Sequence, residues 1–175
     1  MKKERLISLL IIISLVLLVP PVSTAGEKET FLIHLKTSLQ KDDAQICVAY
    51  NMMWAALEEG YDVKVLVDAD AINTYKIGWR GKDDIEDYDI PDNLRQALSK
   101  QFDVSLESVP GTYGAFLLNM KERGVEFYIN TGFLMVSKIG TPDDPLKKVS
   151  NKFFKPVTLK EMVELRTDAK YYMAY

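Results

Sequence analysis

The chain has 175 residues, of which 47% are hydrophobic and 27% are charged, with a formal net charge of -3, one histidine and one cysteine. A mildly acidic chain of this length has no electrostatic reason to bind nucleic acid or anionic lipid, and it is long enough for one domain with its own core. The single cysteine, Cys47, excludes an intramolecular disulfide, so packing or assembly must provide the stability.

Residues 1–25 are typical of an export signal. A basic start is followed by an apolar run from Leu6 to Val19, by two prolines and by small residues at positions 23–25. The run is shorter than the roughly 20 residues that a membrane-spanning helix needs. We therefore predict cleavage before Gly26, a domain of residues 26–175 exported to the periplasm, and no membrane association after cleavage. The alternative is an uncleaved N-terminal segment that anchors the protein in the membrane.

Residues 30–70 are typical of a strand, a polar loop, an amphipathic helix and a second strand. The strands are expected at Phe31–Leu35 and Val63–Val67, and the apolar character of the second indicates that both of its faces are covered. Between them, Asp42 and Asp43 supply an N-cap for a helix from Ala44 to Glu59. This order predicts a right-handed βαβ unit.

The rest of the chain continues the alternation of helices and strands. The charged segment from Tyr75 to Asp89 is expected to be a loop with a solvated acidic run, because it lacks the pattern of a calcium loop. Helices are predicted from Pro91 to Phe102 and from about Gly111 to Arg123, and a third strand from Val125 to Ile129. Further helical and strand patterns follow. We predict a single α/β three-layer αβα domain with a mainly parallel sheet of about five strands and helices on both faces.

The element order and the phrases LKTSLQKDDAQICVAY, LVDADA and KERGVEFYIN resemble the DsrE/DsrF-like family of small α/β proteins, in particular its exported members. Members of this family are associated with sulfur transfer and form trimers or hexamers. The resemblance therefore implies a DsrEFH-like fold, a homo-oligomer, a sulfur-relay protein as a partner and a role in sulfur metabolism. Sulfur-carrying members use a cysteine in the loop after the strand that matches Val125–Ile129.

At that position this chain departs from the family pattern. Asn130, Thr131 and Gly132 follow the strand, so the resemblance places Asn130 where the carrier cysteine would be. A carboxamide is not a nucleophile at ordinary pH and cannot hold a sulfane sulfur. We therefore expect a non-catalytic binding or assembly component with no cofactor and no metal. A structural homo-oligomer without a ligand is one alternative.

Polar residues gather after the predicted strands, where ligands of open α/β sheets bind. They are Lys36, Thr37 and Ser38 after the first strand, Asp68 and Asp70 after the second, and Asn130 and Thr131 after the third. Such a group is expected to bind a small polar or anionic ligand beside the N-terminus of the first helix. The alternative is that these side chains cap helices and satisfy loop backbone groups.

Three further features bear on chemistry. Cys47 is the candidate for the other alternative, a thiol-based sulfur carrier or reductase, but neighbouring Asp42 and Asp43 oppose a thiolate, and a packed hydrophobe is favoured. His34 has no second metal ligand at a standard spacing, so it is expected to be a hydrogen-bonded strand residue rather than a ligand or base. The tyrosines of residues 171–175 either pack on the domain's own helices or extend a subunit interface.

Overall fold

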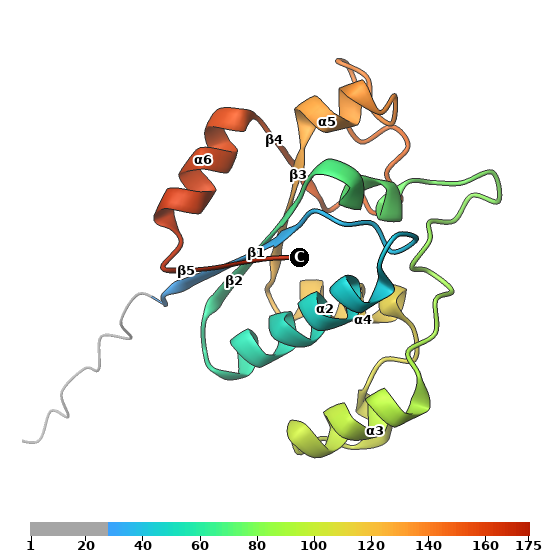
Figure 1. Ribbon diagram of the computed structural model, residues 1–175, viewed down its shortest axis with the longest axis vertical. Coiled ribbons are helices and arrows are strands. Elements are labelled where there is room, and N and C mark those ends of the chain that lie inside the picture. The colour runs from blue at the N-terminus through green and yellow to red at the C-terminus, as the bar shows by residue number, and fades with distance from the viewer. Residues whose placement is uncertain (1–27) are drawn as a thin grey trace, which may run out of the picture.

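Five parallel strands form the centre of the structure, a computed structural model that describes residues 28–175 (Figure 1). Their order across the sheet is β4-β3-β2-β1-β5. The strands are β1 (Thr30–Leu35), β2 (Asp62–Val67), β3 (Glu126–Asn130), β4 (Lys155–Val157) and β5 (Tyr171–Ala174). The expected α/β fold is thus confirmed, and the sheet, predicted to be mainly parallel, is parallel at every described strand pair. The predicted signal segment and its cleavage point lie outside the described residues.

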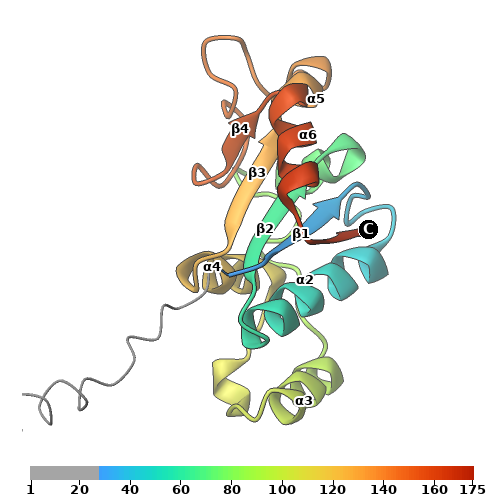
Figure 2. The same cartoon turned by 90° about the vertical axis from the view of Figure 1, so that its left-hand side faces the viewer.

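Helices cover both faces of this sheet (Figures 1 and 2). The α-helices are α2 (Asp43–Glu58), α3 (Asp92–Gln101), α4 (Tyr113–Glu122), α5 (Thr131–Val136) and α6 (Leu159–Asp168). Two 3₁₀ helices, η1 (Ala69–Tyr75) and η2 (Leu106–Ser108), lie between them. Helices α2 and α4 pack together on one side, whereas α6 lies alone on the other side and connects β4 at one edge to β5 at the opposite edge.

The two layers differ in depth. On the α2 side, Ile33, Val65 and Phe127 from three strands belong to one large buried cluster together with residues of α2 and α4. On the α6 side, the buried cluster consists of Leu32, Leu66 and Val157 only. No residue of α6 is fully buried. The α6 layer is therefore thin, and it leaves room between helix and sheet.

The start of α2 follows the sequence prediction closely. The Asp42 side chain accepts hydrogen bonds from the backbone N–H groups of Ala44 and Gln45, so Asp42 is the N-cap and the helix begins one residue earlier than expected. The helix ends at Glu58, and Gly60 follows with a φ of 85°, a conformation that glycine adopts without strain.

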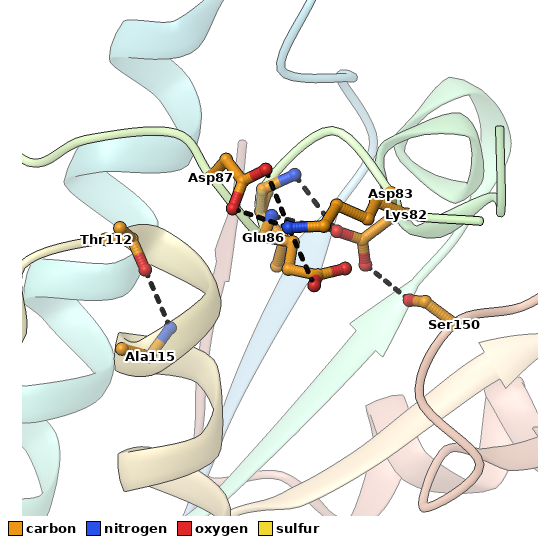
Figure 3. A network of polar contacts seen from close by, with 8 residues as sticks. Lys82, Asp83, Glu86, Asp87, Thr112, Ala115 and Ser150 are labelled. Carbon is orange, nitrogen blue, oxygen red and sulfur yellow. Dashed lines mark hydrogen bonds and ion pairs between the residues drawn. The ribbon is translucent and has the colours of Figure 1, made fainter. Parts of the chain in front are cut away.

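The acidic loop before α3 is folded more tightly than the expected solvated run. The half-buried Asp83 carboxylate accepts hydrogen bonds from the backbone N–H groups of Ile85 and Glu86 and from the Ser150 hydroxyl (Figure 3). Lys82 lies 2.9 Å from Asp87 and pairs with exposed carboxylates only. Burial raises the pKa of the Asp83 carboxyl, although these three donors oppose the shift. Asp83 thus anchors the loop.

The anchored loop packs against the start of α4. Thr112 caps this helix by accepting from Ala115 N–H, as Figure 3 shows, and α4 therefore begins two residues after the predicted start. The Gly114 N–H donates to the Ile85 carbonyl at 2.9 Å. A Cβ at Gly114 would lie 2.8 Å from the Glu86 Cα, so only glycine permits this close approach of loop and helix.

Candidate functional site

The residues predicted to form a cleft after the strands fall into two groups in the structure. Ser38 and Asp70 form the first group, with the Ser38 hydroxyl donating to Asp70 Oδ2 at 2.5 Å. Asn130 belongs to the second group, because its side-chain amide donates to Asp68 Oδ1 at 2.7 Å. Lys36 is exposed, and Thr131 is half-buried at the first position of α5. Thr37 is half-buried between Lys36 and Ser38.

The Ser38 and Asp70 group lines a polar hollow of about 340 Å³. Lys41 Nζ lies 3.2 Å from Asp70 Oδ2, and Asn73 Nδ2 donates to Asp70 Oδ1 at 3.0 Å. Burial raises the pKa of Asp70, but the hydrogen bonds from Ser38, Lys41 and Asn73 outweigh it and hold that pKa below its ordinary value. The donors of this hollow therefore already serve a carboxylate of the protein, with which an anionic ligand would have to compete.

Asp68 is the centre of the second group. Its Oδ1 accepts from Asn130 Nδ2 and, at 2.6 Å, from the backbone N–H of Ala69. Ala69 adopts a φ of 47°, a left-handed conformation that is uncommon for a residue with a Cβ. Asn130 uses its other amide atom as well, because Oδ1 accepts from the Phe133 N–H at 3.2 Å and so caps α5. The residue at the expected carrier position is only 6% exposed and links three elements.

His34 connects Asp68 to the closing strand. His34 Nε2 lies 3.2 Å from Asp68 Oδ2, and Nδ1 lies 2.9 Å from the Tyr172 hydroxyl. Because a carboxylate only accepts, we assign the ring proton to Nε2, which leaves Nδ1 to accept from Tyr172. Burial lowers the pKa of His34 below its ordinary value despite the neighbouring Asp68, so the imidazole is neutral at pH 7. The expectation of a hydrogen-bonded histidine is confirmed, and both ring nitrogens are engaged.

His34 and Tyr172 open into a cavity of about 360 Å³ between the sheet and α6. Its walls are mostly apolar side chains, namely Leu32, Leu66, Leu159, Met162 and Val163. The remaining lining residues are polar, and among them Arg166 places its guanidinium carbon 4.0 Å from the centre of the Tyr172 ring. Apolar walls with a few convergent polar groups are characteristic of small-molecule sites.

Cys47 lies on the opposite side of the sheet from this cavity. It is half-buried on α2, where Asn51 Nδ2 approaches its sulfur at 3.7 Å, and it lines a hollow of about 420 Å³ together with Asp43, Tyr88 and Tyr113. The one histidine of the chain faces α6, so it cannot serve as a base for this thiol.

Two groupings that sequence reasoning did not find, His34 with Tyr172 and Tyr172 with Arg166, define the cavity. Within residues 28–175, no three His, Cys, Asp or Glu side chains are grouped so that they could hold a metal ion. No helix of the same residues combines the length and the apolar character needed to cross a bilayer.

The chain matches no protein-family model, and no curated protein matches it.

Proposed function

We propose that the protein is an exported, DsrE-like binding protein that holds a small molecule in the cavity under α6 and does not carry sulfur. The observation that supports this most directly is the cavity itself, which is apolar except where His34, Tyr172 and the helix residues Arg166 and Thr167 reach it. The His34 side chain is 15% exposed, so the pair of His34 and Tyr172 faces the cavity instead of being enclosed in the core. The resemblance to exported DsrE-like proteins supports the setting in sulfur metabolism.

The cavity lining defines the chemical class of the ligand. A compact apolar body suits the leucine, methionine and valine walls, and burying it there supplies the affinity. A carboxylate at one end suits Arg166, because a guanidinium binds a carboxylate through two parallel hydrogen bonds. The proposed ligand is therefore a small apolar carboxylic acid.

Two features support a role other than sulfur transfer. Asn130 at the expected carrier position is buried, and both of its amide atoms are hydrogen-bonded within the protein. Cys47, the only thiol, lies on the other side of the sheet from the chain's one histidine. A thiol carrier based on Cys47 is the second candidate, because this half-buried residue packs against the core and also lines a hollow.

Binding is tested by titrating isotope-labelled protein with 3-phenylpropionate and with the neutral 3-phenylpropanol while the backbone amide signals are followed by NMR. Amides of α6 and β5 should shift, and the carboxylate should bind more tightly than the alcohol. Arg166→Met should abolish that difference. Arg123→Met is the matched control, because Arg123 lies over the Trp54 ring at 5.4 Å in the other helical layer. Shifts confined to the Ser38 and Asp70 hollow, or no shifts at all, would reject the cavity as the site.

We further propose that the mature protein begins at Gly26 and assembles into a trimer or hexamer. The apolar run and small residues of the first 25 positions support cleavage. The family resemblance and two half-exposed apolar side chains of the edge strand, Tyr171 at 38% and Met173 at 40%, support assembly. Intact-mass measurement of exported material and sedimentation at micromolar concentration test the two proposals. A mass that retains residues 1–25, or a monomer alone, would contradict them.

A further inference from the structure

The hydrogen bonds around Asp68 have a fixed direction. Asp68 Oδ1 is occupied by two N–H donors, Ala69 and Asn130, while Oδ2 receives the His34 Nε2–H. The remaining ring nitrogen, Nδ1, therefore presents its lone pair to Tyr172, whose hydroxyl lies 2.9 Å away. Carboxylate, imidazole and hydroxyl in this order are the arrangement in which an oriented base activates a hydroxyl group. Here the hydroxyl group is a phenol, the most acidic of the side-chain hydroxyls.

We propose that Tyr172 is a general acid–base residue of the cavity, that His34 and Asp68 are positioning residues for it, and that the ligand is a carbonyl acid with an exchangeable C–H beside the carbonyl. This inference rests on the proposed function, since it assigns chemistry to the same cavity. Proton exchange and keto–enol interconversion are the reactions that follow from it.

The proton transfer balances without any co-reactant. The ligand C–H bond breaks, its proton goes to the Tyr172 oxygen, and the Tyr172 proton moves to His34 Nδ1. The electron pair of the C–H bond stays on the ligand as an enolate, and the imidazolium remains paired with Asp68. In the reverse step His34 returns a proton through Tyr172 to the carbon, or to the oxygen to give the enol. Nothing is oxidised or reduced.

The surroundings of the Tyr172 hydroxyl suit this transfer. Arg166 of α6 lies over the Tyr172 ring, where its charge stabilises a developing enolate. Lys36, after β1, is a cation that acts on His34, and together with burial it opposes protonation of the ring. A neutral imidazole keeps its lone pair available at pH 7. Mostly apolar walls strengthen such electrostatic effects relative to bulk water.

The test uses phenylpyruvate in deuterated water, with loss of the benzylic proton signal followed by NMR. The wild-type protein should accelerate this exchange over buffer, and Tyr172→Phe, which keeps the ring under Arg166 but lacks the hydroxyl, should lower the accelerated rate by about 100-fold or more. His34→Gln should lower it similarly. Tyr171→Phe is the matched control and should exchange like the wild type, because Tyr171 packs against Phe31 on the opposite face of β5.

The pH profile separates a proton-transfer role from a structural one. The wild-type rate should fall at acidic pH as His34 becomes protonated, and the fall should occur below the ordinary pKa range of histidine because burial lowers the pKa of His34. The residual rate of His34→Gln should lack this step. A profile that is the same in both proteins would refute the positioning role of His34.

Amide shifts on phenylpyruvate addition are measured on the same samples, so that binding and proton transfer can fail separately. Shifts at α6 and β5 without accelerated exchange, or exchange that survives Tyr172→Phe, would overturn the proton-transfer role and leave the binding function standing. Absence of both shifts and exchange would overturn the two proposals together.

Discussion

Replacing Asn130 with alanine should lower the free energy of unfolding by about 2.5–4 kcal/mol. The substitution removes a helix cap on the Phe133 N–H, which is worth about 1 kcal/mol, and a hydrogen bond to the Asp68 carboxylate, which is worth roughly 1.5–3 kcal/mol. Water cannot replace these partners easily, because Asn130 is 6% exposed. The loss should therefore be close to the full value of both hydrogen bonds.

Urea unfolding followed by circular dichroism measures this loss. Thr131→Ala is the control, because Thr131 is the next residue and only half-buried, and it should change the free energy of unfolding by less than about 0.5 kcal/mol. Asn130→Cys should lose about as much as Asn130→Ala, and its buried thiol should not accept sulfur from a donor. Asn130→Ala and Thr131→Ala proteins of equal stability would refute the assignment of Asn130 as a structural link.

Three further outcomes follow from the described contacts. Gly114→Ala should destabilise the protein by about 1–3 kcal/mol in thermal melts, because the new Cβ would meet the Glu86 backbone. Gly111→Ala is the control and should not destabilise it, because the space around Gly111 is open. Equal melting temperatures of the two variants would contradict this prediction. Burial lowers the pKa of His34, so just below the ordinary pKa of histidine the unfolded chain binds more protons than the native protein. The free energy of unfolding should therefore rise with pH in that range, and His34→Gln should flatten the rise. An unchanged slope in the variant would argue against this role of His34. Cys47→Ala should lower the free energy of unfolding by on the order of 1 kcal/mol. Native protein given a persulfide donor should gain no adduct of about 32 Da, the mass of one sulfur atom, by mass spectrometry. Such an adduct on Cys47 would favour the thiol carrier.

Local patterns in the sequence predicted most of the fold. The apolar strands and the amphipathic stripe of α2 predicted the βαβ unit, and the Asp42 cap and Gly60 marked the helix ends correctly. The 3₁₀ helix Ala69–Tyr75 was missed, because it follows a strand directly and has no recognisable apolar period, although Asp68 caps it. Its buried residues, Ile72 and Tyr75 among them, had no apolar alternation to reveal them.

The candidate site was harder to predict because it depends on strand neighbours. His34 and Tyr172 are 138 positions apart in sequence, and they meet because β5 pairs with β1 at the edge of the sheet. Local periodicity does not predict which strand the last strand of the chain pairs with. Asn130 could be placed at a strand end from sequence, but its hydrogen bond to Asp68, which follows β2, depends on β2 and β3 being neighbours in the sheet.

The thin layer formed by α6 has a consequence for how the cavity is reached. The large core of β1, β2 and β3 with α2 and α4 does not depend on α6, whose residues all keep contact with solvent and whose Leu159 and Val163 are 69% and 62% exposed. Segments with so little burial open locally at a small fraction of the global unfolding free energy. We therefore expect excursions of α6 away from the sheet to let the proposed ligand enter and leave the cavity. Amides of α6 should accordingly exchange with solvent long before those of α2, and a ligand lying beneath the helix should slow them.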